Sequence, residues 1–275
     1  MARLIALDMP ASKTFVDLVQ RAWSNGDAVL PIDQRLPLAG KKMLLDAMAP
    51  SEIIDASFTA STLPNGRPMQ DGDALVIASS GSTGSPKGII HTHSSILSGA
   101  QASASRLQLS ASDHWLVCIP VSHVGGFSVI ARALHTGAAL TLLPAFDVAA
   151  VQAAAKNGAT HTSLVATALS RIDNSLFKSI LLGGSSAPDN LPSNVITTYG
   201  MTETVTHIAI KKLNNFNLIP ESKNKTLLQA ENDFRSRHAE LISASHYKTL
   251  PNVKISIDSR NCLVIDAPKI CDKKI

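Results

Sequence analysis

The sequence predicts an α/β fold in which mostly parallel sheets are flanked by helices. Two observations carry this prediction. Short apolar runs of strand length recur between residues 74 and 212, and stretches with apolar residues at helical spacing separate them. Strands that alternate with helices are typical of parallel sheets, because each helix returns the chain to the edge where the next strand begins. A chain of 275 residues, of which 45% are hydrophobic, is also long enough to bury the core of such a domain.

The expected elements follow one another along the chain. The expected strands are mostly apolar runs, at residues 28–32, 74–78, 115–120, 139–143, 179–182 and 194–198. The expected helices carry apolar residues three or four positions apart, at residues 15–23, 94–107, 127–135 and 148–156. Residues 59–73 are rich in turn-forming residues and predict a loop. Residues 253–257 and 262–265 alternate like strands around a turn at 258–261, which predicts a hairpin.

The overall charge and the cysteines exclude several classes of protein. Lys and Arg total 25 against 21 for Asp and Glu, a net charge of +4, and no basic stripe with interleaved aromatic residues points to a nucleic-acid partner. Cys118, Cys262 and Cys271 form no C-x-x-C pair, so neither a zinc site nor a disulfide framework is expected. Because the thiols are expected to be reduced, and we find neither a membrane-spanning apolar run nor a secretory signal, we expect a cytoplasmic protein.

The strongest chemical signal is a loop of glycine, serine and threonine directly after the expected strand at 74–78. Residues 79–88 read SSGSTGSPKG. Glycines let the backbone approach a ligand closely, exposed N–H groups in such a loop bind anions, and Lys87 supplies a mobile positive charge, so the loop suits a polyphosphate. It is not a Walker A loop, because Pro86 stands where that pattern needs its second glycine and Gly88 where it needs a hydroxyl.

Three motifs in order resemble those of the acyl-adenylate-forming enzymes, a family of acyl- and aryl-CoA ligases, peptide-synthetase adenylation domains and luciferases. The loop at 79–88 resembles the family's phosphate-binding motif. Residues 181–188 (LLGGSSAP) resemble its adenine-side loop, and residues 199–204 (YGMTET) are similar to its Y-G-x-T-E motif. Three motifs in the family's order are more specific than any one alone. The resemblance implies the fold of the N-terminal domain of these enzymes.

A fourth segment narrows the resemblance to one kind of ligase. Residues 119–126 (IPVSHVGG) resemble the P-L-x-H-x-x-G segment of CoA ligases. Together with residues 26–37 (GDAVLPIDQRLP), they resemble the o-succinylbenzoate–CoA ligases of menaquinone biosynthesis. The resemblance therefore implies a small carboxylic acid as substrate, ATP and Mg²⁺ for its activation, and CoA as co-substrate. It leaves the identity of the acid and the oligomeric state open.

The resemblance also implies a role for each motif residue. The β- and γ-phosphates of ATP would be held by Ser80, Gly81, Ser82, Thr83, Gly84 and Lys87. The adenine would lie against Gly183, Gly184, Ser185 and Tyr199. Thr202 would bond the α-phosphate, and Glu203 would ligate Mg²⁺, a cation that takes a few carboxylate oxygens beside phosphate oxygens. His123 would lie near the carboxylate or gate the acyl pocket. The residues expected to act in catalysis are Lys87, His123, Thr202 and Glu203.

The implied reaction has two steps. A carboxylate oxygen attacks the α-phosphorus of ATP and pyrophosphate leaves; the thiol of CoA then takes the acyl group. Little covalent chemistry falls on the protein, so positioning and charge neutralisation would carry catalysis. Two alternatives stay open: a catalytically inactive nucleotide-binding remnant of such a ligase, and a ligase with another acceptor, such as a carrier-protein thiol.

The sequence departs from the family's pattern in its last third. After Glu203 we find no equivalent of the family's ribose-binding Asp, its hinge or the catalytic Lys of its small C-terminal domain, so we expect a chain truncated before that domain and slowed in adenylation. Residues 237–246 are similar to translated copies of a short repeated genomic element in bacteria. We therefore predict an AMP-binding N-terminal domain at 1–212, an inserted polar segment at 213–249 and a strand pair at 250–275 that continues the domain.

Overall fold

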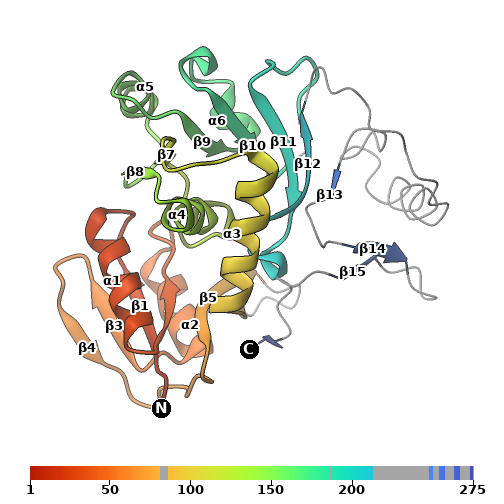
Figure 1. Cartoon of the computed structure of the whole chain (residues 1–275). Coiled ribbons are helices and arrows are strands. Elements are labelled where there is room, and N and C mark those ends of the chain that lie inside the picture. Colours follow the sequence, from red (N-terminus) through yellow and green to blue (C-terminus); the bar gives the residue numbers. More distant parts are fainter. Residues whose placement is uncertain are drawn as a thin grey trace.

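The structure, a computed structural model, describes residues 1–80, 86–185 and 187–212, together with the backbone of four short strands beyond residue 212 (Figure 1). Its main body has two seven-stranded sheets with helices between and around them. A separate antiparallel pair is formed by β14 (Lys254–Ile257) and β15 (Leu263–Asp266). Within the described residues the longest helix has 15 residues, and none is both long and apolar enough to cross a membrane.

The first sheet is parallel in its centre and antiparallel at its edges. Its strands in spatial order are β16 (Lys273–Lys274), β6 (Pro86–Thr92), β5 (Asp73–Ser80), β2 (Ala28–Pro31), β1 (Leu4–Asp8), β3 (Glu52–Asp55) and β4 (Ala60–Thr62). Strands β5, β2, β1 and β3 run parallel, whereas β4, β6 and β16 are antiparallel to their neighbours. The central strands β1 and β2 are buried almost throughout, as parallel strands with both faces covered must be.

The second sheet has five parallel strands and an antiparallel edge. Its strands in spatial order are β13 (Lys248–Thr249), β12 (His207–Lys212), β11 (Val195–Gly200), β10 (Ser179–Leu182), β9 (His161–Leu164), β7 (His114–Val117) and β8 (Ala139–Leu142). Strands β11 to β8 are parallel, and β12 and β13 are antiparallel. Parallel strands bring their carboxyl ends to one edge, where ligands bind in open α/β sheets.

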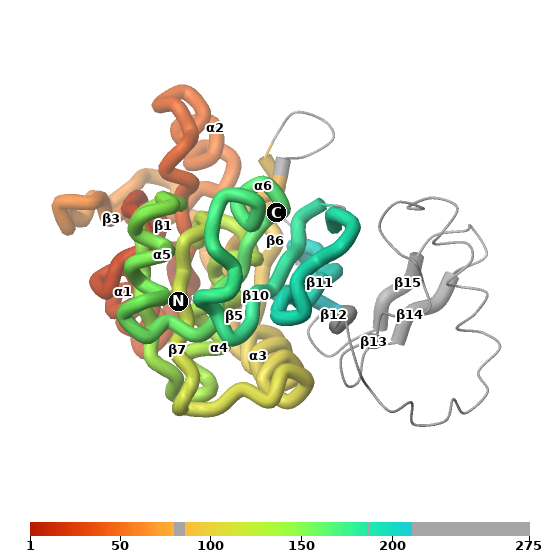
Figure 2. Tube along the Cα trace, turned by 90° about the horizontal axis from the view of Figure 1, so that it is seen from above, coloured from red at the N-terminus to blue at the C-terminus, as the bar shows by residue number. Residues whose placement is uncertain are grey.

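The helices are placed by their apolar faces and capped by local side chains. They are α1 (Lys13–Ser24), α2 (Leu38–Met48), α3 (His93–Leu107), α4 (Val124–Thr136), α5 (Val148–Lys156) and α6 (Ala166–Leu169), with 3₁₀ turns η1 (Asn174–Leu176) and η2 (Thr202–Thr204). Ser12 caps α1 by accepting a 3.1 Å hydrogen bond from the Phe15 amide, and Asp147 caps α5 by accepting one of 2.8 Å from Ala150. Helix α2 packs beside β6 (Figure 2).

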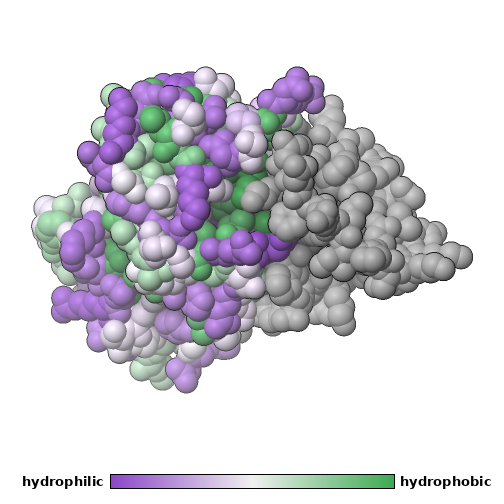
Figure 3. Space-filling model, turned by 45° about the horizontal axis from the view of Figure 1, so that its top comes forward, coloured by the Kyte–Doolittle hydropathy of each residue, from purple (hydrophilic) through white to green (hydrophobic). Residues whose placement is uncertain are grey.

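The main core joins the two sheets through the helices between them. Helix α3 packs against β5, β6 and α4, and α4 packs against β7, β8 and β9. Phe15 of α1, Trp115 of β7 and Phe127 of α4 are almost fully buried in this one cluster. A buried side chain of that size stabilises the fold by roughly 2–3 kcal/mol. On the face shown in Figure 3, hydrophilic residues cover much of the described outer surface, and hydrophobic residues show mainly in its recessed centre.

The α/β prediction is confirmed, and most expected elements are present. Strand β10 and helix α5 have the predicted bounds, and β14 pairs with β15 as the expected hairpin, whose turn lies outside the described residues. Two expectations were wrong in detail. Residues 59–73 are not all loop, because Ala60–Thr62 pairs with β3. Lys87 lies on strand β6 rather than in a loop, because residues 86–92 pair with β5 and place Lys87 opposite Ser79.

Candidate active site

A cavity of about 980 Å³ lies where the carboxyl ends of strands from both sheets converge. Its wall includes residues 9–11 after β1 and 32–35 after β2, which belong to the first sheet. The second sheet contributes the residues that follow its parallel strands, at 118–125, 144–146, 163–165, 183–184 and 200–202. A cavity of this size at this edge is the usual position and volume for a small-ligand site in an α/β protein.

Four of the residues assigned by resemblance meet on the wall of this cavity: His123, Gly183, Gly184 and Thr202. They come from the start of α4, from the turn after β10 and from η2 after β11. These four residues are spread over about 80 positions of the sequence. They meet at one site because β7, β10 and β11 end at the same edge of the second sheet.

The other assigned residues lie beside the cavity or outside the described part of the chain. Glu203 follows Thr202 on η2, which packs against β6, the strand that carries the exposed Lys87. Ser185 is exposed just beyond the cavity's glycines, and Tyr199 packs partly buried against the main core. Ser80 ends β5. The glycine-loop residues Gly81, Ser82, Thr83 and Gly84 lie outside the described residues.

Two glycines on the cavity wall are required by close contacts. A Cβ at Gly183 would lie 2.7 Å from the Thr198 hydroxyl oxygen, and one at Gly200 would lie 2.7 Å from the carbonyl oxygen of Thr206. Both spacings are shorter than real Cβ contacts: at Gly200 the neighbour is backbone, so β11 and β12 can approach this closely only with glycine there, and at Gly183 a side chain would displace the Thr198 hydroxyl. Val205, directly after η2, has φ 64°, which is strained for a β-branched residue. The turn that carries Thr202 and Glu203 is thus tightly specified.

His123 forms a polar group with Asp33 and Arg35 at the cavity wall. Its Nε2 lies 2.6 Å from Nη2 of Arg35 and 3.4 Å from an Asp33 carboxylate oxygen, and Arg35 is itself paired with Asp33 at 2.6 Å. A guanidinium only donates hydrogen bonds, so Nε2 of His123 is the acceptor in this contact. The hydrogen bond from Arg35 lowers the pKa of Asp33. Arg35 and Asp33 therefore hold the imidazole of His123 beside the cavity.

The sequence analysis missed Arg132, the most unusual residue on the wall. It lies on α4 with only 2% of its surface exposed. Its Nη1 donates to the hydroxyls of Ser128 at 3.1 Å and Thr206 at 3.2 Å, and its Nη2 donates to the hydroxyl of Ser163 at 3.2 Å. The signal was present in the sequence, because Arg132 is the one charged residue in the apolar helical stretch 127–134.

Arg132 has no acidic partner among the described residues. Its Nε is buried without an acceptor there, and its three described hydrogen bonds leave one N–H of Nη2 over. Burial lowers the pKa of Arg132 to about 9, so the guanidinium is charged at neutral pH. In this chain the same pair of nitrogens, Nε and Nη2, clasps a carboxylate at Arg3 and at Arg35. Arg132 thus places a buried positive charge on the cavity wall, with two N–H groups that have no acceptor among the described residues.

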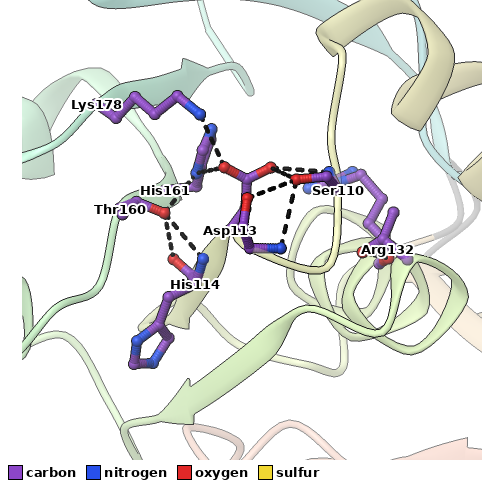
Figure 4. Close-up of polar contacts among 9 residues, drawn as sticks. Ser110, Asp113, His114, Arg132, Thr160, His161 and Lys178 are labelled. Carbon is purple, nitrogen blue, oxygen red and sulfur yellow. Dashed lines mark hydrogen bonds and ion pairs between the residues drawn. The ribbon is translucent and has the colours of Figure 1, made fainter.

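A second polar cluster lies away from the cavity, at the start of β7 (Figure 4). The buried carboxylate of Asp113 accepts hydrogen bonds from Lys178 Nζ at 2.9 Å and from the Ser110 amide at 2.8 Å, and lies 3.7 Å from His161 Nδ1. Burial opposes the charge of Asp113, but the hydrogen bonds from Lys178 and Ser110 outweigh it and lower its pKa. Burial lowers the pKa of His161 to about 4, so this imidazole is neutral.

The cysteine described by the structure agrees with a reduced, unreactive thiol. Cys118 follows β7, lines the cavity and is buried. Burial raises its pKa to about 11, so the thiol stays protonated at neutral pH. Cys262 and Cys271 lie outside the described residues. No group of three potential metal ligands from His, Cys, Asp and Glu occurs within the described ranges.

Comparison with known proteins agrees with the motifs. Curated relatives include the 2-succinylbenzoate–CoA ligases of Bacillus cytotoxicus, 37% identical over 149 residues, and of Enterococcus faecalis, 33% identical over 155 residues. These alignments cover 48% and 50% of this chain but only 31% and 32% of the relatives, so the chain matches about a third of their length.

Solved structures share the fold. The o-succinylbenzoate CoA synthetase of Bacillus subtilis in complex with ATP and magnesium ion superimposes with a TM-score of 0.75 at 20% identity, over 99% of this chain and 62% of that one. The same enzyme in complex with its acyl-adenylate intermediate gives a TM-score of 0.74 over 61% of its length.

A model of the AMP-binding enzyme family matches residues 12–227, which contain the motif residues and the cavity wall from Ile32 to His207. This match covers well over half of the chain. The chain therefore belongs to the AMP-binding enzyme family.

Proposed function

We propose that this chain activates a carboxylic acid with ATP as an acyl-adenylate and transfers the acyl group to CoA, as an o-succinylbenzoate–CoA ligase does. One observation carries the proposal furthest. The cavity joins the Thr202 turn, where the α-phosphate would lie, to the buried Arg132, which has no acidic partner among the described residues. A substrate with a second carboxylate would neutralise that charge, and o-succinylbenzoate has two.

The nucleotide would bind across the ends of β5, β10 and β11. Ser80, Lys87 and the glycine loop would hold the β- and γ-phosphates, and Gly183, Gly184, Ser185 and Tyr199 would line the adenine site. Thr202 would donate its hydroxyl to the α-phosphate. The position of Gly183, Gly184 and Thr202 on the wall of one cavity supports this arrangement.

Glu203 is the residue we propose for Mg²⁺. A single carboxylate suits this cation, which in nucleotide sites takes most of its remaining ligands from phosphate and water oxygens. Bound there, the cation would neutralise the negative charge of the phosphates.

The protein's part in the reaction is to position and to neutralise. Thr202 and Lys87 would hold the phosphates in line while a carboxylate oxygen attacks the α-phosphorus and pyrophosphate leaves. His123, held in place by Arg35, would lie beside the reacting carboxylate. In the second step the CoA sulfur attacks the acyl carbon and AMP leaves.

The first test is the melting temperature with and without Mg·ATP. A ligand at 100 times its dissociation constant stabilises the fold by about 2.7 kcal/mol, or roughly 5–10 °C for a chain of this size. We expect this rise in the wild-type chain and its loss in Lys87→Ala and Glu203→Ala. Lys42→Ala, which removes an exposed lysine of α2, is the matched control and should keep the rise.

Turnover then separates the alternatives. Pyrophosphate release that depends on o-succinylbenzoate, with the adenylate trapped by hydroxylamine or CoA, would support the ligase. Stabilisation by ATP without pyrophosphate release would instead support a nucleotide-binding protein without catalysis. Trapping of the adenylate by a carrier-protein thiol but not by CoA would show that the acceptor is a carrier protein rather than CoA. No rise in a cooperatively melting wild-type sample would contradict the proposal.

A further inference from the structure

Arg132 is held over an aromatic ring as well as by hydroxyls. Its guanidinium carbon lies 4.8 Å from the centroid of the Trp115 ring. Trp115 lies on β7, is fully buried, and its indole N–H has no acceptor among the described residues. A cation over an aromatic face is attracted by the ring's quadrupole, and most strongly where water is excluded. The indole therefore acts on Arg132 through its face.

The Trp115 ring is in turn fixed by the residue beside it in the sheet. Trp115 and His161 are register partners on the parallel strands β7 and β9, and their ring centroids lie 5.0 Å apart with a tilt of 36°. His161 Nδ1 lies 2.8 Å from the hydroxyl oxygen of Thr160 and 3.7 Å from Asp113, whose carboxylate is anchored by Lys178. This chain of contacts leads from the surface lysine to the cavity (Figure 4 shows its outer half).

Along this series of contacts, Arg132 is the positive charge that lies at the cavity. His161 is neutral at working pH, because burial holds its pKa near 4. Asp113 is paired with Lys178, whose side chain is 64% exposed, so the negative charge of Asp113 is neutralised by a lysine at the surface. A charged imidazole next to the indole would weaken the hold of the ring on the guanidinium, whereas a neutral one supports the ring without adding charge.

We propose that Trp115 is a positioning residue that holds the Arg132 guanidinium in the cavity and so sets the preference for a substrate with a second carboxylate. Together the Trp115 face and the hydroxyls of Ser128, Ser163 and Thr206 fix the guanidinium from four elements, α4, β7, β9 and the turn after η2. The N–H of Nε and one N–H of Nη2 have no acceptor among the described residues. This inference rests on the proposed function, because it assumes an acidic acyl substrate in this cavity.

The test compares two acyl sulfamates of adenosine, which are stable analogues of an acyl-adenylate. One carries the o-succinylbenzoyl group, and the other lacks only the ring carboxylate. We expect the wild-type chain to bind the first at least about tenfold more tightly, the value of a charge-assisted hydrogen bond. Trp115→Met, which keeps an apolar side chain but removes the aromatic face, should reduce this preference by about tenfold. Trp115→Phe, which keeps a ring face, should retain most of it.

The ratio of the two affinities separates positioning from a structural role. A variant that is merely less stable binds both analogues less well and leaves the ratio unchanged. An unchanged ratio in a folded Trp115→Met chain would overturn the inference, and so would a wild-type chain that is stabilised by Mg·ATP but binds both analogues equally. A wild-type chain that is not stabilised by Mg·ATP contradicts the proposed function itself.

A second measurement leaves Trp115 in place, in case Trp115→Met does not fold. The chain has two tryptophans, so Trp23→Phe makes Trp115 the one fluorescent indole. We expect the analogue with the ring carboxylate to shift the Trp115 emission. Its negative carboxylate would pair with the Arg132 guanidinium, which lies over the Trp115 ring, and would so change the electric field at the indole. The analogue without that carboxylate should shift it much less. Equal shifts with both analogues, or none with either bound, would contradict the inference.

Discussion

Nε2 of His123 accepts a 2.6 Å hydrogen bond from Arg35, a residue 88 positions earlier in the chain. The two residues connect the loop after β2 in the first sheet to the start of α4 beside the second. Because the side chains are more than half exposed, the bond contributes little to stability, and its effect is to orient the imidazole.

Removing Arg35 should therefore affect binding more than folding. We expect Arg35→Ala to change the melting temperature by less than about 3 °C but to weaken the binding of the acid several-fold, since His123 loses its fixed orientation. Calorimetric titration of the acid in the presence of Mg·AMP measures this. Arg21→Ala, which removes an exposed arginine of α1, is the control and should change neither quantity. Equal acid affinity in Arg35→Ala and wild type would show that Arg35 does not serve the site.

Replacing Arg132 should separate stability from binding. Arg132→Met removes a buried charge that lacks an acidic partner in the described structure, so we expect the melting temperature without ligand to stay equal or to rise by a few degrees. Affinity for the analogue with a ring carboxylate should fall by at least tenfold. Thermal melts and the two-analogue comparison provide both readings.

Arg3→Met is the contrasting control for that experiment. Arg3 pairs at 2.7 Å with Asp27, whose side chain is only 5% exposed, so its removal leaves a buried carboxylate without its ion-pair partner. We expect the melting temperature of Arg3→Met to fall by several degrees. A comparable fall in Arg132→Met would mean that Arg132 serves the fold rather than a ligand.

Two adjacent glycines at the start of α4 should respond differently to the same substitution. A Cβ at Gly126 would overlap the carbonyl of Pro120, with its carbon only 2.7 Å away, whereas a Cβ at Gly125 meets nothing nearer than a side-chain carbon of Ile119 at 3.6 Å. We expect Gly126→Ala to lower stability by about 2 kcal/mol or more and to distort the loop that carries His123. Gly125→Ala should be neutral or slightly stabilising. Chemical denaturation of both variants checks this, and equal midpoints would refute it.

The free energy of unfolding should decrease as the pH is lowered, because the chain buries histidines. Burial lowers the pKa of His91 to about 4, and the nearby backbone of Thr202 and charge of Glu203 oppose this only in part. The unfolded state binds the proton from about pH 6.5 downward and the folded state does not, so stability is full above pH 6.5 and is lost as the pH falls towards 4. His91 contributes up to about 1.4 kcal/mol per pH unit in that window, and His161 adds in the same direction.

The variant His91→Gln should remove its share of this slope. Denaturation midpoints between pH 7 and pH 4.5 measure the slope, and His135→Gln, at an exposed position near the end of α4, is the control that should keep it. A slope in His91→Gln as steep as in the wild type would show that His91 takes up its proton in the folded state.

Deleting residues 214–246 tests the hypothesis of an inserted segment. If these residues are an insertion in a surface connection, their removal should leave the melting temperature and the stabilisation by Mg·ATP nearly unchanged, because loop-closure entropy depends only weakly on length. Thermal melts of the shortened chain with and without Mg·ATP provide the comparison. A fall of more than about 5 °C, or loss of the ATP effect, would mean that the segment belongs to the domain.

Local sequence patterns predicted the strands and helices whose apolar residues follow a regular pattern. Strand β10 and helix α5 could be predicted to the residue, because one is a continuous apolar run and the other has regular spacing and an Asp147 cap. Strand β9 (HTSL) was missed, because it is half polar and its burial comes from neighbouring strands. The start of β6 was read as loop, because Pro86 and Gly88 are turn formers and only the pairing with β5 makes them a strand.

The residues of the candidate site also divide into those that local patterns predict and those that they do not. Gly183 could be identified from its motif, although its close contact with Thr198 of the neighbouring strand is visible only in the folded chain. Arg132 and Trp115 could not, because the importance of each lies in burial and in contacts between residues far apart in the chain. A charged residue in an apolar helix was visible in the sequence, but its missing counter-ion is a property of the folded chain.

The cavity wall draws on both sheets, with residues 9–11 and 32–35 on one side and the carboxyl ends of β7 to β11 on the other. A ligand that fills it would therefore act as a bridge between two halves that otherwise meet through α3, α4 and the core. In a scanning calorimeter, such a bridge would appear as a sharper transition with ligand than without, because the ligand adds to the coupling that the shared core already provides.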